Sequence, residues 1–397
     1  RSSEAFAHLG RCVPEDGSAR FLKDECVKDY ERGFAGPLLS RADMDRRYGE
    51  ARWLPMPRFE VVQASGKRRP IDDGKRFGHN EASGFLETIE CCSATQPATH
   101  LRALYVAASQ QGAADELQGH RAETGGEDMP DAYRWVPADP KEAHLNVVAV
   151  YDCDAKEWVF QVMHGQVFGR AAAVVNFHRV QRIIVAMARR WLHLMASMYY
   201  DDATLQDLGV ARGRGQRYLR ALFRELGLPL AEHKQVDLNN EADFLGLTHD
   251  VGAALSTGEL VFEPRKGLLA KAGELILQAL HGNVCIPAQA SKIRGVLGFV
   301  FTGTYGRVGR GGQQALLQRQ YFDTEPFTLS HALRRSLRYL LDTLQVLPQR
   351  RVRLCGDESL PIIIASDGRA DESGPPSVGM VLFDPQTGRK CAVAARI

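Results

Sequence analysis

The alternation of hydrophobic and polar residues along the chain predicts several β-hairpins. Residues 59–63 and 66–73 form one expected hairpin, whose turn and second strand are rich in basic residues. Residues 145–151 (LNVVAVY) and 158–163 (WVFQVM) flank a polar turn and predict another. An apolar segment at residues 362–368 begins a further β-unit near the end of the chain. The pattern thus indicates that strands are spread over most of the sequence.

Helical periodicity, with apolar residues recurring every three or four positions, accounts for most of the remaining chain. Gly125–Gly126 is expected to break the chain, and residues 244–247 are expected to form a short apolar strand. The glycines and arginines of residues 303–312 predict a flexible basic loop, because the GKS/T of a phosphate-binding loop is absent. Residues 1–60 carry little pattern. The expected helices cover residues 82–118, roughly 171–197, 214–227, 264–281, 288–299 and 328–346.

The stretch around Tyr199-Tyr200-Asp201-Asp202 holds two adjacent carboxylates between two apolar segments. Neighbouring side chains on a strand point to opposite faces, so these carboxylates share a site only where the backbone turns. The tip of a β-hairpin meets that condition. A buried, unpaired carboxylate is costly, so such a pair faces either water or a cation. A solvated turn explains the same residues, because Asp is common in turns.

Asp128 is a third candidate carboxylate, far upstream of the hairpin. Its side chain converges with those of Asp201 and Asp202 if the two strands that carry them are neighbours in one sheet. A cluster of oxygen ligands suits hard divalent cations. Two Mg²⁺ ions held close together can activate an attacking oxygen and stabilise a leaving one, as nucleotidyl transfer requires.

Composition sets the class of protein but not its partner. The chain has 397 residues and 44% hydrophobic residues, enough for two or three domains with apolar cores. The net charge is only +2, so a case for nucleic acid must rest on local basic clusters. Each of these is explained equally well as a solvated face. The clusters lie at residues 67–69, 212–220, 307–310 and 334–353.

The eight cysteines are scattered and show no CxxC spacing, which argues against a zinc ribbon. Scattered thiols are typical of an intracellular protein, in either cytoplasm or nucleus. The sequence holds no run of about 18 apolar residues, so we expect no membrane span. The chain starts without Met and ends within a strand pattern, which favours a fragment of a longer protein.

The order of these motifs resembles the polymerase domain of reverse transcriptases from retrotransposons and retroviruses of the LTR type. Together the motifs cover about residues 59–250, and their shared order and spacing make the resemblance far more specific than any one of them. The matching segments are Arg69-Pro70-Ile71-Asp72 with Asn80, Asp128 to Tyr133, Phe168-Gly169 with Phe177, Tyr199 to Asp202, Gly227 to Leu230 with Lys234, and Phe244-Leu245-Gly246.

The resemblance implies a role for each matching residue. Asp128, Asp201 and Asp202 would hold two Mg²⁺ ions, with Mn²⁺ as the alternative metal, and Lys234 would protonate the leaving pyrophosphate. Tyr133 would pack under the sugar of the incoming nucleotide and leave no room for a 2′-hydroxyl. The remaining roles are nucleotide contacts by Lys67, Arg68 or Arg69 and by Phe168 and Gly169, and primer or template contacts by Tyr199, Tyr200, Leu245 and Gly246.

The resemblance also implies a fold of the α+β class, a right-handed polymerase with an antiparallel palm sheet. Residues 358–397 resemble the start of a ribonuclease H-like α/β module, in which Asp367 ends an apolar strand that pairs with residues 378–382. An unrelated strand ending in Asp is the alternative. The expected segments are an N-terminal extension (1–58), fingers (59–125), palm (126–250), thumb and connection (251–357) and the partial nuclease-like module (358–397).

The function that follows is RNA-templated DNA synthesis by a fragment of a retroelement reverse transcriptase. Its partners would be an RNA or DNA template with its primer and deoxyribonucleoside triphosphates. One alternative is an RNA-dependent RNA polymerase with the same palm, against which Tyr133 argues. The other is a catalytically decayed, nucleic-acid-binding remnant of a mobile element, in which carboxylates would be lost, whereas all three remain here.

Overall fold

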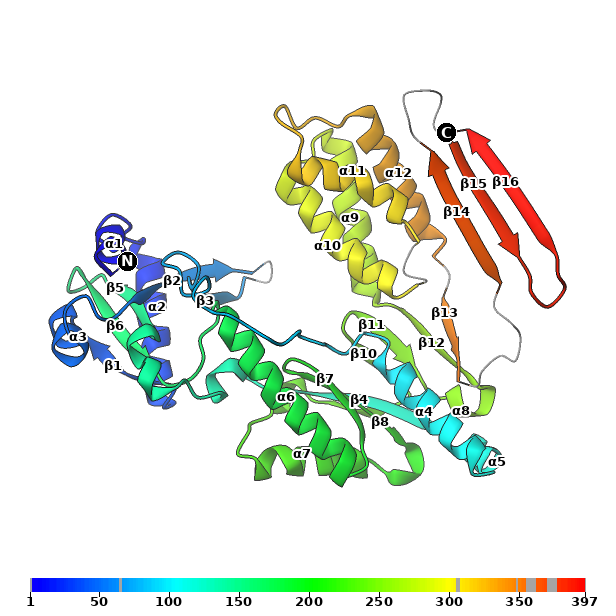
Figure 1. The fold of residues 1–397 in the computed structure, drawn as a ribbon, viewed down its shortest axis with the longest axis horizontal. Coiled ribbons are helices and arrows are strands. Elements are labelled where there is room, and N and C mark those ends of the chain that lie inside the picture. The colour runs from blue at the N-terminus through cyan, green and yellow to red at the C-terminus, as the bar shows by residue number, and fades with distance from the viewer. Residues whose placement is uncertain are drawn as a thin grey trace.

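A computed structural model describes residues 2–63, 66–304, 308–347, 349–354, 362–369 and 377–396. Within them the chain forms several β-sheets and a helical bundle, an α+β architecture (Figure 1). Part of the basic loop expected at 303–312, including Gly306 and Arg307, lies outside the described residues, as does Cys355. No helix in the described part of the chain is long and apolar enough to cross a membrane.

The first sheet has the strand order β1-β6-β5-β2-β3 and confirms both hairpins expected before residue 170. A parallel pairing of β2 with β5 joins the two hairpins. Its helices are α1 (Ser2–Leu9), α2 (Asp16–Glu31) and α3 (Arg41–Tyr48). Its strands are β1 (Ala35–Leu39), β2 (Pro55–Val62), β3 (Arg68–Asp72), β5 (Val147–Asp152) and β6 (Glu157–Met163).

The first 60 residues, which carried little pattern, belong to this sheet. Strand β1 pairs with β6, and helix α2 buries Leu22 and Cys26 against Val148 and Val150 of β5. Strand β2 starts at Pro55, so it spans the boundary predicted between residues 58 and 59. Short strands and helices of mixed composition form here because the apolar residues of β5 and β6 need cover on both faces.

The second sheet has the order β7-β8-β4-β9 with every pairing antiparallel. Helices α6 (Ala171–Trp191) and α7 (Arg214–Glu225) pack on this sheet. The 3-10 turns in the connecting segments are η1 (Ala132–Trp135), η2 (Pro140–Leu145), η3 (Gly209–Ala211) and η4 (Glu232–Lys234). Helix α6 ends six residues before the predicted position because its last expected turn is strand β7. The strands are β4 (Ala122–Asp128), β7 (Met195–Tyr199), β8 (Asp202–Leu208) and β9 (Val236–Asn239).

The prediction that Gly125–Gly126 breaks the chain was wrong, because both glycines lie inside β4. A Cβ atom on Gly125 would come within 2.7 Å of the Val236 carbonyl oxygen of β9. One on Gly126 would come within 2.8 Å of the Ala203 carbonyl oxygen of β8. The glycines therefore permit close approach of both neighbouring strands rather than a turn.

The third sheet, of order β10-β11-β12-β13, corrects two further predictions. Residues 244–247 form a turn rather than a strand, since Leu245 and Gly246 have φ angles of 48° and 82°. Within residues 82–118, only α4 (Gln96–Gln110) and α5 (Ala114–Gln118) are helical. The other elements are α8 (Ala254–Thr257), β10 (Glu241–Phe244), β11 (Leu247–Asp250), β12 (Glu259–Pro264) and β13 (Arg350–Arg353).

A four-helix bundle lies between β12 and β13 in the sequence (Figure 1). Three helices match the predictions, whereas the fourth, α11, begins at Arg310, within the segment expected to be a flexible loop. Gly312 lies in α11, and a Cβ there would be 2.7 Å from Leu340 Cγ, so this glycine allows close packing of two helices. The helices are α9 (Lys266–Gly282), α10 (Pro287–Thr302), α11 (Arg310–Tyr321) and α12 (His331–Gln345).

The last sheet is an antiparallel meander of β14 (Ile363–Arg369), β15 (Ser377–Phe383) and β16 (Lys390–Arg396). It confirms the β-unit expected from residue 362. Asp367 does not end its strand as predicted, because β14 continues for two further residues and pairs Asp367 with Gly379.

Candidate active site

Three carboxylates meet at one end of the second sheet because of its register. Asp128 is the last residue of β4 and lies opposite Asp202, the first residue of β8. Asp202 also lies opposite Tyr199 of β7, so Tyr200 and Asp201 form the tip of the β7–β8 hairpin. The Met129 amide donates to the Asp201 carbonyl oxygen at 3.1 Å, which ties the tip to the end of β4.

This cluster concentrates negative charge. Desolvation by the surrounding chain, together with the charges of Asp201 and Asp128, raises the pKa of Asp202 to about 6. The same desolvation and the charge of Asp128 raise the pKa of Asp201, against the opposing effects of Lys234 and Arg69. Three carboxylates packed this closely favour a bound cation, since a cation relieves their mutual repulsion.

Lys234 supplies one positive charge at the cluster. It lies in η4, and its ammonium donates to Asp128 Oδ2 at 2.7 Å. The Ala231 amide donates to the Asp128 carbonyl oxygen at 2.8 Å, so the segment that carries Lys234 begins bonded to the end of β4. The structure therefore places a cationic proton donor directly on one of the three carboxylates.

The donor atoms of this cluster are all carboxylate oxygens, the ligands that Mg²⁺ prefers. Among the described residues, however, no group of three or more His, Cys, Asp and Glu side chains stands in an arrangement that closes on a metal ion. The Lys234 ammonium lies on Asp128 Oδ2. The ligand chemistry thus fits Mg²⁺, and an ion at Oδ2 requires the ammonium to move.

An aromatic wall stands beside the carboxylates. Tyr133 of η1 lies with its ring 4.9 Å from that of Phe168 and 5.5 Å from that of Phe177, measured between centroids. Burial and the nearby charge of Asp201 raise the pKa of the Tyr133 hydroxyl. The ring is therefore held between a packed aromatic group and the carboxylate cluster.

The Phe168–Gly169 loop is fixed against the end of β3. The Asp72 amide donates to the Phe168 carbonyl oxygen at 2.9 Å. The Asn80 side chain donates to the Gly169 carbonyl oxygen at 3.0 Å and accepts from the Ala171 amide at 2.8 Å. Gly169 has φ of 108°, and a Cβ there would lie 1.9 Å from the Asp72 carbonyl oxygen, so only glycine fits.

The three basic residues at the start of β3 differ in their surroundings. Arg68 pairs with Glu60 and places its guanidinium 4.3 Å from the centre of the Phe21 ring, away from the carboxylates. Arg69, on the opposite face of β3, is near enough to lower the pKa of Asp201. Lys67 is exposed. Of the three alternatives, Arg69 is the one whose charge acts on Asp201.

The residues assigned to primer or template contacts are divided between two places. Tyr199 and Tyr200 stack edge to face at the hairpin, with ring centroids 5.2 Å apart. The Leu245–Gly246 turn lies against the helical bundle instead, since a Cβ on Gly246 would be 3.0 Å from Leu268 of α9. Asp367 is exposed in the separate last sheet.

Sequence reasoning missed the residues behind the cluster, above all Arg220 and Gln216 of α7. Both contact Glu127, which neighbours Asp128 in β4 and is 3% exposed. Strand alternation offered a signal, because consecutive acidic residues in a central strand point to opposite faces, and each buried acid needs its own partner.

No protein-family model and no curated protein matches this sequence. Among 478 solved chains of similar structure is a foamy viral protease–reverse transcriptase in complex with double-stranded DNA. The fold resembles that of a reverse transcriptase. The similarity has a TM-score of 0.55 over 93% of this chain, at 12% sequence identity. Because the identity is this low, the likeness concerns the fold alone. The chain spans about half the length of that neighbour, 54%.

Proposed function

We propose that this chain is the polymerase part of a retroelement reverse transcriptase and performs RNA-templated DNA synthesis. The observation that carries the proposal is the register of β4 and β8, which sets Asp128 opposite Asp202 beside the hairpin tip. The likeness to a reverse transcriptase fold supports it. In this proposal the second sheet is the palm, the first sheet the fingers, and the bundle the thumb and connection.

Each residue near the cluster has a task in this proposal. Asp128, Asp201 and Asp202 hold two Mg²⁺ ions, which when bound activate the primer hydroxyl and stabilise the leaving pyrophosphate. Arg69, whose charge lowers the pKa of Asp201, pairs with the triphosphate. Lys234, once off Asp128, donates a proton to pyrophosphate as a general acid.

Product choice follows from the aromatic wall. Tyr133 is packed against Phe168 and Phe177, so its ring has little freedom to move aside for a 2′-hydroxyl. This packing favours deoxyribonucleotides, and hence DNA synthesis over RNA synthesis. Nucleotide choice in primer extension separates the two.

The test is Mg²⁺-dependent primer extension on an RNA template with the Asp201→Asn variant. Removing one ligand charge should lower extension at least a hundredfold, while binding of the template–primer stays near wild type because it rests on basic groups. Asp154→Asn, in the exposed turn between β5 and β6, is the matched control and should extend normally. Equal rates for Asp201→Asn and wild type would refute the proposal. If the unmutated protein bound the template–primer but did not extend it, the catalytically decayed remnant would be favoured.

A further inference from the structure

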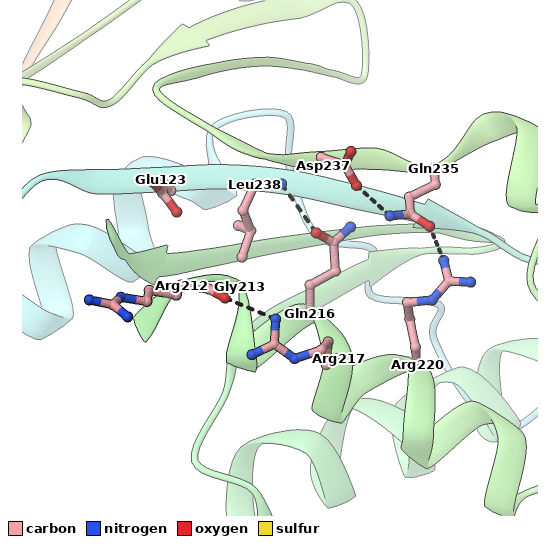
Figure 2. A pocket seen from close by; sticks show the side chains of 9 residues that line it. All are labelled: Glu123, Arg212, Gly213, Gln216, Arg217, Arg220, Gln235, Asp237 and Leu238. Carbon is pink, nitrogen blue, oxygen red and sulfur yellow. Dashed lines mark hydrogen bonds between the residues drawn. The ribbon is translucent and has the colours of Figure 1, made fainter. Parts of the chain in front are cut away.

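A cavity of about 520 Å³ lies behind the carboxylate cluster, between α7 and the β4–β9 edge (Figure 2). Figure 2 shows Gln216 extending from α7 toward Leu238, and Arg220 extending toward Gln235. Three arginines line the cavity, with Glu123 and Asp237 on its opposite side. The charges of these side chains nearly balance, which argues against an anionic ligand in the cavity. The hydrogen bonds of the lining residues to the neighbouring chain are the more informative feature.

The turn that carries Lys234 wraps the edge of β4. It starts where the Ala231 amide bonds the Asp128 carbonyl oxygen, and it ends where Val236 pairs with Gly126. Consecutive residues of β4 face opposite sides of the sheet, so Glu127 points to α7 when Asp128 points to Lys234. Asp128 therefore contacts the turn directly from one face of β4, and Glu127 is linked to it through Arg220 on the other face.

Arg220 holds this turn from behind, on both sides of Lys234. One terminal nitrogen donates to the Glu232 carboxylate and the other to the Gln235 side-chain oxygen. The guanidinium is anchored in turn by Glu127, with Nη1 3.1 Å from Oε2. It thus connects the residue two before Lys234 and the residue after it to a buried acid of β4.

Gln216, one turn earlier on α7, reinforces the same attachment. Its amide nitrogen donates to Glu127 Oε1 at 2.9 Å and to the Val236 carbonyl oxygen at 3.0 Å. Its oxygen accepts from the Leu238 amide at 3.1 Å. Helix α7 is thereby bonded to β9 immediately after the turn, and the segment that carries Lys234 has few ways to shift.

We propose that Arg220 is a positioning residue for Lys234, a role that rests on the proposed function. By fixing Glu232 and Gln235 against Glu127, Arg220 holds the turn itself in place, so that the Lys234 ammonium stays near the carboxylates after it leaves Asp128 Oδ2. Without this link the turn gains conformational freedom, and the ammonium spends less time where a leaving pyrophosphate forms. Misplacing a catalytic group by about 1 Å costs up to about a hundredfold in rate.

The experiment compares Arg220→Met and Lys234→Met singly and together in primer extension under single-turnover conditions. Arg220→Met should lower the maximal rate about tenfold with little change in the KM for deoxyribonucleotides. The double variant should be no slower than Lys234→Met alone, because Arg220 acts only through Lys234. Arg220→Lys, which keeps one charge but not the fork, should restore part of the rate.

Arg217→Met is the matched control, since Arg217 lines the same cavity but its guanidinium donates only to the Arg212 carbonyl oxygen among the contacts described for it. It should extend at the wild-type rate. The inference is overturned if the effects of Arg220→Met and Lys234→Met multiply, or if Arg220→Met changes only the unfolding temperature. Loss of extension in Asp201→Asn with a normal rate in Lys234→Met would remove the acid role and with it this inference, while leaving the proposed polymerase intact.

Discussion

Asp202 is a single side chain whose charge is governed by its neighbours. It faces Asp128 across the β4–β8 ladder and follows Asp201 directly, so its ionised form meets two like charges. The sequence predicted that these carboxylates converge only if the strands that carry them are neighbours in one sheet, and the β4–β8 pairing meets that condition. It did not predict Lys234 on Asp128 Oδ2, since that contact depends on a turn wrapping a strand edge.

The raised pKa of Asp202 makes stability depend on pH in a defined direction. The folded chain holds the proton up to about pH 6, whereas the unfolded chain releases it near the ordinary Asp value of 3.8, so stability falls as pH rises between these values. Asp202→Asn should therefore raise the unfolding temperature at pH 7.5 in EDTA, and the gain should fade toward pH 4. Asp43→Asn should show the opposite sign, because Ser40 lowers the pKa of Asp43.

Tyr133 sets the second prediction at the residue scale. Tyr133→Ala should open the space beneath the sugar, so ribonucleotide incorporation should rise relative to deoxyribonucleotide by roughly tenfold or more, since one lost steric clash is worth a few kcal/mol. Tyr133→Phe keeps the ring and should keep the wild-type ratio. The measurement is competitive incorporation on one template–primer. An unchanged ratio in Tyr133→Ala would mean that the Tyr133 ring only packs in the core and does not select the sugar.

At the scale of elements, the hairpins were predictable and the connections were not. The strands β5 and β6 are nearly continuous apolar runs on either side of a polar turn, and they formed where expected. Helix α6 ended early because β7 competes for its last apolar residues. Gly125 and Gly126 gave the signal of a break, although their role is to let β9 and β8 approach. Such tertiary contacts outweigh local propensity.

The Phe168–Gly169 loop supports a prediction about one element. Gly169→Ala should destabilise the fold by about 2 kcal/mol or more, because the added Cβ meets the Asp72 carbonyl oxygen and φ is 108°. Gly273→Ala, in α9 with open space around it, should be neutral or stabilising by up to about 1 kcal/mol. Urea unfolding measures both. Similar stability for Gly169→Ala and wild type would mean that the loop is not fixed as described.

For the whole molecule, the sequence indicated the α+β class, but not how distant segments share sheets. The first sheet joins β1 to β6, and β2 to β5, across more than 80 residues of chain. The third sheet recruits β13 to β12 after the entire bundle. Pairings of this kind depend on which edges meet in space, and a local pattern of apolar residues does not specify them.

The late pairing of β13 has a consequence for folding during synthesis. When β12 leaves the ribosome its outer edge has no partner, because residues 350–353 are made only after the four helices of the bundle. Helices close local contacts quickly, so the bundle can form while that edge waits. Until Arg350 to Arg353 arrive and Leu354 is buried, β12 offers unpaired backbone groups to any other nascent strand. Slow translation through the bundle should therefore favour aggregation over correct assembly.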